Sequence, residues 1–193
     1  MSTFNSYLVL GFQHIMNIQA LDHLLFILSI TCIYKFYDAK KLLLLITAFT
    51  LGHSLTLALA TLKWIEFSQN WIEFLIPCTI LFSAFANLNF KETKIKSTKL
   101  SRRKFILVSI FGLIHGLGFS NYLQSLLGQE SSILSPLLAF NIGLELAQII
   151  VVASILFFSN ILIELFKIKL TYYVLVISGI IIGLSLPMVL ERW

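Results

Sequence analysis

Long apolar runs alternate with short polar or turn-forming segments along the whole chain. A helix needs about 20 mostly apolar residues to cross the hydrocarbon core of a bilayer. Runs of that kind predict six spanning helices, over residues 19–35, 42–62, 71–90, 105–127, 136–160 and 171–190. The chain is therefore expected to be an all-α, polytopic membrane helical bundle, with residues 1–193 in a single transmembrane domain.

The segment Thr3–Met16 does not fit this series, because it is apolar but too short to cross a bilayer alone. It is predicted to form a short membrane-associated helix. A re-entrant segment and an N-terminal extension of the first span are the alternatives. Asn17 and Gln19 follow it, and their polar side chains predict a break in the chain around Asn17–Ala20.

The basic residues predict the orientation of the bundle. Twelve of the fourteen Lys and Arg residues fall in three alternate loops, and these are Lys35, Lys40, Lys41, Lys91, Lys94, Lys96, Lys99, Arg102, Arg103, Lys104, Lys167 and Lys169. Loops rich in Lys and Arg stay in the cytoplasm. Both termini are then expected on the outer side of the membrane.

Composition agrees with a protein that contacts the lipid bilayer. Hydrophobic residues make up 58% of the chain and charged residues only 12%, against about 25% charged residues in soluble domains. The net charge of +5 does not indicate nucleic-acid binding, because the basic residues lie in short loops between apolar runs. Cys32 and Cys78 lie within apolar segments and form no disulfide framework or Cys-x-x-Cys motif.

The chain has four histidines, each within or beside an apolar run. Ionisable residues inside a membrane are costly, and they usually face a bundle interior, a pore or a bound ion. At about 1.5 Å of rise per residue, His23, His53, His115 and Glu145 all lie roughly 17–21 Å from the cytoplasmic ends of their helices. His14 is expected just beyond this layer, at the outer face. The alignment in depth predicts a shared site.

Other polar residues accompany this layer. Asp22 precedes His23, and Thr50 and Ser54 lie beside His53. Asn141, Glu145 and Gln148 follow the spacing i, i+4, i+7 and therefore share one helix face. Gly112 and Gly116 flank His115, and small residues at this spacing let two helices approach closely. Thr50, Ser54, Asn141 and Gln148 are accordingly predicted to support the site.

Imidazole nitrogens and carboxylate oxygens together suit divalent first-row transition metals such as Ni²⁺, Co²⁺, Zn²⁺ and Fe²⁺. The predicted metal-binding residues are His14, Asp22, His23, His53, His115 and Glu145. Asp22 is expected either to bind the metal or to orient His23 from behind. No purely catalytic residue and no site for an organic cofactor is predicted.

Four short motifs resemble those of the HupE/UreJ family of membrane proteins. They are Gly11-Phe12-Gln13-His14 with Asp22-His23-Leu24-Leu25-Phe26, then Thr47–Leu57, then His115-Gly116-Leu117-Gly118-Phe119, and finally Phe140–Gln148. The resemblance implies a metal-handling protein of a bacterial inner (cytoplasmic) membrane, whose outer side is the periplasm. It favours a nickel or cobalt permease that serves hydrogenase or urease systems. Partners in metalloenzyme maturation and a homo-oligomer both stay open.

Two other functions use the same residues. A membrane metalloenzyme could activate water at a metal held by these ligands, although the chain has no His-Glu-x-x-His or Gly-x-Ser-x-Gly motif. A b-type haem protein could use His53 and His115 as axial ligands, but Asp22 and Glu145 do not suit an apolar haem pocket. Transport is favoured over enzymatic use of the site.

Overall fold

The computed structural model describes residues 2–90, 100–127 and 133–193, so Lys91, Lys94, Lys96 and Lys99 lie outside the described residues. Its elements in chain order are α1 (Thr3–Met16), α2 (Asp22–Thr31), η1 (Phe36–Asp38), α3 (Ala39–Thr61), α4 (Gln69–Leu88), α5 (Arg102–Gly118), α6 (Ser120–Leu127), α7 (Leu134–Asn160), η3 (Ile161–Leu165) and α8 (Leu170–Glu191). Within these ranges the fold is entirely helical, as the sequence predicts.

Four helical segments are long and apolar enough to cross a membrane. They are α3 together with η1, α4, α7 together with η3, and α8. Helices α5 and α6 make a fifth candidate span if they are counted together, although a bend of 51° separates them. The protein is therefore a helical membrane bundle with four to five candidate spans, and the predicted number of six is not confirmed.

The difference arises at the first predicted span, residues 19–35. Helix α2 has only 10 residues, which rise about 15 Å, half the thickness of a hydrocarbon core. It begins late because Asn17 forms a turn: its side-chain oxygen accepts a hydrogen bond from the Gln19 backbone N–H at 3.0 Å, and its carbonyl accepts one from Ala20 at 3.2 Å. The predicted break is thus confirmed, and α1 is a separate helix.

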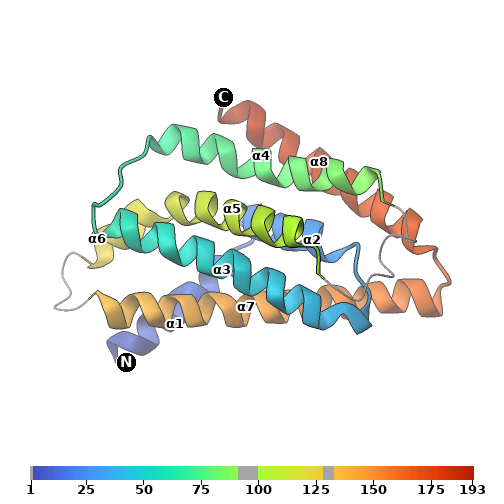
Figure 1. The fold of residues 1–193 in the computed structure, drawn as a ribbon, viewed down its shortest axis with the longest axis horizontal. Coiled ribbons are helices and arrows are strands. Elements are labelled where there is room, and N and C mark those ends of the chain that lie inside the picture. Colours follow the sequence, from blue (N-terminus) through green and yellow to red (C-terminus); the bar gives the residue numbers. More distant parts are fainter. Residues whose placement is uncertain (1, 91–99, 128–132) are drawn as a thin grey trace.

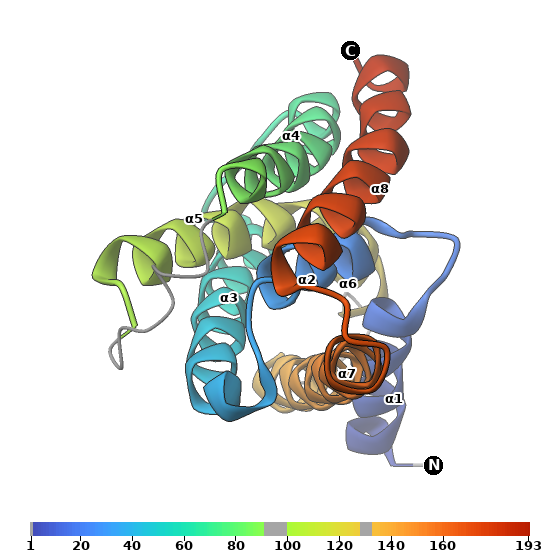
Figure 2. The same ribbon diagram turned by 90° about the vertical axis from the view of Figure 1, so that its right-hand side faces the viewer.

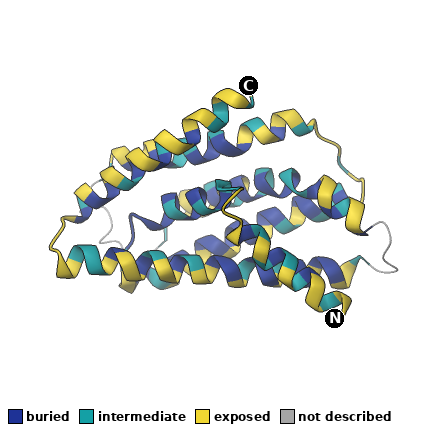
Figure 3. Ribbon diagram, turned by 180° about the vertical axis from the view of Figure 1, so that it is seen from behind, coloured by how far each residue is buried: buried dark blue, intermediate teal, exposed yellow. Residues whose placement is uncertain are grey.

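Helix α2 lies in the middle of the bundle. Figure 1 shows α3, α5 and α7 running along the long axis, with α4 and α8 paired on one side and α1 crossing α7 on the other. Figure 2, along that axis, shows α2 enclosed among α3, α7 and α8. Its buried residues extend through the helix, whereas the outer helices expose one face (Figure 3).

Three glycines bring the backbones of α3 and α5 into direct contact. A Cβ atom on Gly52 would overlap the carbonyl oxygen of Ser109, and one on Gly112 would overlap that of Phe49. A Cβ atom on Gly116 would meet the carbonyl of His53 in the same way. The close approach predicted from Gly112 and Gly116 is confirmed, and it places His115 against α3.

Glycines also bring the backbones of α1 and α7 into direct contact. A Cβ atom on Gly11 would overlap the carbonyl oxygen of Phe140, and one on Gly143 would overlap that of Leu8. Each glycine therefore lies where any side chain would push the two helices apart. The bundle contains two glycine-packed pairs, α3–α5 and α1–α7, and the end of α1 next to α2 carries His14.

Gly112→Ala tests this packing. Alanine favours a helix more than glycine does, yet here we expect the added methyl group to destabilise the protein by about 1–3 kcal/mol, the usual cost of overpacking. Gly179→Ala in α8 is the matched control, because a Cβ atom there meets nothing within 4 Å. Thermal unfolding in detergent, followed by circular dichroism, should show a lower midpoint for Gly112→Ala alone. Equal midpoints for the two variants would contradict the packing argument.

Candidate functional site

Four histidines from four helices meet inside the bundle. His14 lies in the last turn of α1, His23 in the first turn of α2, His53 in the C-terminal half of α3, and His115 in the last turn of α5. His53 and His115 have no exposed surface, and His23 is 4% exposed. We call these four residues the histidine cluster.

His23 is the centre of the histidine cluster. Its ring centroid lies 4.5 Å from that of His14, 5.3 Å from that of His115 and 5.9 Å from that of His53. His14 and His53 are 6.0 Å apart. The shared site predicted for these four histidines therefore has a geometrical basis, with one residue in contact with all the others.

Local structure explains why the rings meet. The break after α1 lets the chain turn and begin α2 within a few residues, so that His14 and His23 face each other across the turn. The glycine-packed interface of α3 and α5 places His53 and His115 on adjoining turns, because the backbones around Gly112 and Gly116 touch Phe49 and His53.

Five ring nitrogens of the histidine cluster are buried without a hydrogen-bond partner among the described residues. They are Nε2 of His14, His23 and His115, and both Nδ1 and Nε2 of His53. A buried polar atom without a partner typically costs about 1–3 kcal/mol. Several such atoms within one group of neighbouring rings indicate a binding site for a ligand that supplies the missing interaction.

Two of these imidazoles are held in a defined tautomer. The Nδ1 atom of His115 lies 2.8 Å from the carbonyl oxygen of Phe111, which can only accept a hydrogen bond, so Nδ1 carries the hydrogen. The Nδ1 atom of His23 lies 3.3 Å from Oδ1 of Asp22. In both residues Nε2 is left with a free lone pair, the form that binds metals.

Asp22 makes the contact with His23 that the orienting alternative requires. Its Oδ1 atom also accepts a hydrogen bond from the backbone N–H of His23 at 3.0 Å. It lies in the first turn of α2, where the partial positive charge of the helix terminus favours a carboxylate. A carboxylate that fixes a histidine from behind is a common partner of metal-binding imidazoles.

Phenylalanines enclose the histidine cluster. Phe49 lies 5.2 Å from His115 and 6.0 Å from His53 between ring centroids, and Phe26 lies 5.3 Å from His115. Phe119 stacks close to His14, at 4.1 Å, and Phe140 lies 5.8 Å from the same ring. The rings line the histidine cluster with apolar surface and reduce the access of water to it.

None of these phenylalanines is predicted from the sequence to lie around the site. A signal was available, because Phe26 follows His23 by three residues and Phe49 precedes His53 by four. Residues three and four apart lie on the same face of a helix. Aromatic residues at that spacing from a membrane histidine are therefore candidates for the wall of its site.

An open groove of about 620 Å³ reaches the histidine cluster from the end of the bundle where α1 turns into α2. Its lining includes Gln13, His14, Asn17, Gln19 and Tyr122. His14 is half-buried and is the member of the cluster that lines this groove. The groove gives a polar approach to an otherwise enclosed set of imidazoles.

The predicted supporting residues lie in a separate row of contacts between α3 and α7, which we call the polar row. The hydroxyl of Thr50 donates to Gln148 Oε1 at 2.9 Å, and that of Ser54 donates to Asn141 Oδ1. Thr47 donates to a carboxylate oxygen of Glu145 at 2.8 Å.

The polar row bonds within itself rather than to the imidazoles. The hydroxyl of Thr50, which is predicted to support the site, bonds to Gln148 and not to an imidazole. Glu145 is half-buried, and its bond to Thr47 lies at the exposed edge of the α3–α7 contact.

The side chains do not stand in a metal-binding arrangement. In the ranges that the structure describes, no group of three or more His, Cys, Asp or Glu residues is positioned to hold a metal ion. Ligand nitrogens lie only about 2.0–2.1 Å from a metal such as zinc. Histidine rings whose centroids are 4.5–6.0 Å apart have to turn toward a common point before they can bind the same metal ion.

Comparison with known proteins gives one match. A search of curated proteins and a search of solved structures both find no match to this chain. A family model described as HupE / UreJ protein matches residues 1–192, which include every helix described above. The chain is therefore a multi-pass membrane protein that belongs to the HupE/UreJ family.

Proposed function

We propose that this protein is a transition-metal permease, with Ni²⁺ or Co²⁺ as its substrate, and that the histidine cluster binds the ion within the membrane. The observation that carries the proposal is the contact of four histidine rings from α1, α2, α3 and α5, with five ring nitrogens that have no hydrogen-bond partner among the described residues. Family membership supports it, since the HupE/UreJ resemblance implies nickel and cobalt handling.

The chemistry of the histidine cluster suits these ions. Neutral imidazole binds nickel, cobalt and zinc well, whereas Mg²⁺ and Ca²⁺ prefer oxygen ligands. Cys32 lies directly after α2, at the end away from His23, and Cys78 lies in α4. A ligand set without thiolate favours reversible binding, which a transport site requires.

The surroundings of the histidine cluster support access from one side only. The groove beside His14 opens toward the turn between α1 and α2. On the opposite side, Phe26 contacts Phe49 and Phe111, with ring centroids 4.9 Å and 5.8 Å apart. We infer that an ion approaches past His14 and that these three phenylalanines close the path beyond His23 in this conformation.

The membrane orientation that we propose for the bundle rests on the distribution of its basic residues. Lys35, Lys40 and Lys41 precede or begin α3, Lys104 begins α5, and Lys167 and Lys169 precede α8. These segments lie together at one end of the bundle, which we call the basic end (Figure 1). The positive-inside rule then favours a cytoplasmic basic end in a bacterial inner membrane, with the groove and both termini toward the periplasm.

Removal of His53 tests the site. His53→Ala deletes two unpaired nitrogens, and we expect it to weaken Ni²⁺ binding by about ten-fold or more, measured by isothermal titration calorimetry of the protein in detergent. Ser185→Ala removes a fully buried polar group from α8 and is the control. Wild-type protein that binds no Ni²⁺ or Co²⁺, or a His53→Ala variant that binds as tightly as wild type, would contradict the proposal.

A graded change at Asp22 tests its orienting role. Asp22→Leu removes the partner of His23 Nδ1, and loss of such a partner typically weakens metal binding about 10–100-fold. Asp22→Asn keeps an oxygen that can accept the same hydrogen bond, so we expect a smaller loss. Equal losses in the two variants would indicate that the negative charge acts directly on the ion.

A substitution of Glu145 tests transport separately from binding. We propose that Glu145, whose partner in the polar row is Thr47, contributes to transport from outside the histidine cluster. Glu145→Gln is expected to slow uptake of radioactive Ni²⁺ into proteoliposomes by about ten-fold, the effect of roughly 1.4 kcal/mol on a barrier, while Ni²⁺ affinity stays within two-fold. Glu191→Gln, the same exchange at an exposed residue at the end of α8, controls for general effects of substitution. Binding without any flux in the wild type would favour the metalloenzyme instead.

A further inference from the structure

A second cavity, of about 550 Å³, lies at the basic end, away from the histidine cluster. It is enclosed by residues of α2, α3, α4 and α5 and by the segments that flank α2 and α4. Its volume falls within the range of about 300–1,000 Å³ that is usual for small-molecule sites. Neither the proposed metal path nor the family motifs account for it.

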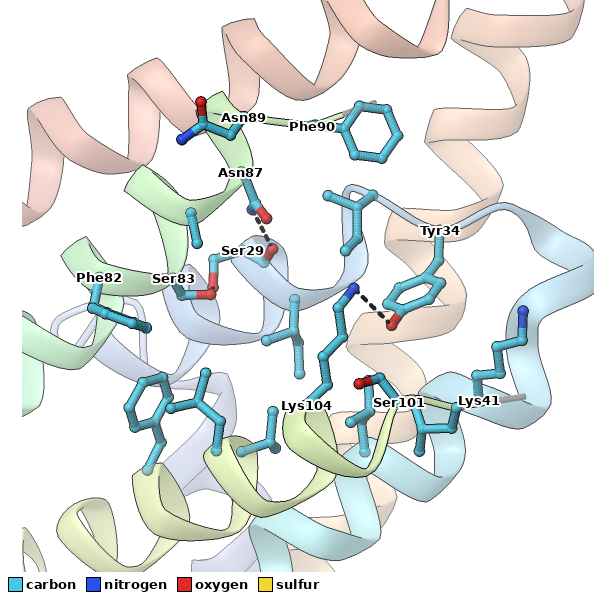
Figure 4. A pocket seen from close by; sticks show the side chains of 18 residues that line it. Ser29, Tyr34, Lys41, Phe82, Ser83, Asn87, Asn89, Phe90, Ser101 and Lys104 are labelled. Atoms are coloured by element: carbon cyan, nitrogen blue, oxygen red, sulfur yellow. Dashed lines mark hydrogen bonds between the residues drawn. The ribbon is translucent and has the colours of Figure 1, made fainter. Parts of the chain in front are cut away.

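The cavity is amphipathic. Its apolar lining includes Phe82, Leu107 and Phe111. Figure 4 shows Phe82 at one side of the cavity and Tyr34 at the other, with Lys104 extending toward Tyr34. The polar groups deeper in the cavity are already bonded to one another: Ser29 donates to Ser83, and Asn87 donates to the carbonyl of Ser29. An occupant therefore needs a long apolar part and one polar group placed near Tyr34 and Lys104.

The charges of the residues that line the cavity indicate that the polar group of the occupant is an anion. The residues that line the cavity include Lys41 and Lys104 and, among the described residues, no Asp or Glu. Lys41 forms an ion pair with Asp38, which is not part of the lining. Lys104 contacts Tyr34, with its Nζ atom 3.5 Å from the hydroxyl and 5.2 Å from the ring centroid.

These contacts leave Lys104 available to an anion. An ammonium group has three hydrogen-bond donors, and Lys104 makes no ion pair with any residue in the described part of the chain. An exposed cation at the mouth of an apolar cavity complements an anionic head on a hydrocarbon chain. A transition-metal cation, by contrast, is repelled by the same lysines.

We propose that this cavity binds one anionic phospholipid, with an acyl chain between α4 and α5 and the phosphate at Lys104. Basic pockets between membrane helices on the cytoplasmic side are typical sites for acidic lipid headgroups. The lipid would cover the polar edge where Lys104 and Tyr34 meet and fill the space bordered by Phe82 and Phe111.

Native mass spectrometry of the full chain in detergent tests the proposal. We expect one phosphatidylglycerol molecule per chain to bind at least five-fold more tightly than phosphatidylcholine of the same acyl chains. Lys104→Gln should weaken phosphatidylglycerol binding about five-fold, the effect expected for one basic residue near an acidic lipid. Lys40→Gln changes the exposed residue next to Lys41 and should leave phosphatidylglycerol binding unchanged.

A second variant tests the apolar part of the cavity. Ala86 lines it and is exposed, so Ala86→Phe should fill the acyl site and weaken binding while the lipid-free protein unfolds at the same temperature. Equal binding of the two lipids, or wild-type binding by Lys104→Gln, overturns the proposal. Competition by glycerol phosphate as effective as that of the intact lipid also overturns it, because the site would then recognise a free anion.

Discussion

The contact between the backbones of α3 and α5 is the constraint on which the site depends. Gly52, Gly112 and Gly116 leave no room for a side chain between the two helices, so their relative position is fixed more tightly than side-chain packing alone could fix it. Because Gly116 touches the carbonyl of His53, the same contact sets the distance between His53 and the neighbouring His115. A membrane interior gives no hydrophobic driving force for helix association, which makes such close packing the main source of precision.

The second constraint is the cost of unpaired polar atoms. The polar row satisfies itself, as the bonds of Thr50 to Gln148 and of Ser54 to Asn141 show. The histidine cluster does not, although His23 and His115 each use Nδ1 for a fixed partner. The polar row thus satisfies itself, whereas five of the nine buried side-chain atoms without a partner in the described residues belong to the histidine cluster. The other four are the hydroxyls of Thr31, Thr61, Ser178 and Ser185. This contrast is stronger support for a binding site than the number of histidines is.

Much of this arrangement follows from the sequence. Apolar runs gave the extents of α3, α4, α7 and α8 to within a few residues, because a span needs a continuous apolar stretch. The sequence did not give the shortness of α2 or the bend between α5 and α6, since both depend on local turns inside runs that stay apolar. Depth arithmetic correctly grouped His23, His53 and His115. It could not distinguish them from Glu145, because depth carries no information about the direction in which a side chain points around its helix.

The positions of the glycines also indicate which helices can move relative to one another during the proposed transport of an ion. The pair α3–α5 carries His53 and His115, and the pair α1–α7 carries His14, each pair held rigid by backbone contact. Helix α2 contains no glycine and lies between the pairs, and His23 is the ring in contact with all three others. Rings that must converge on one ion and later separate can do so if the two pairs shift relative to each other. The turn at Asn17 is then the part of the chain that absorbs the motion, and Asp22 keeps His23 oriented throughout.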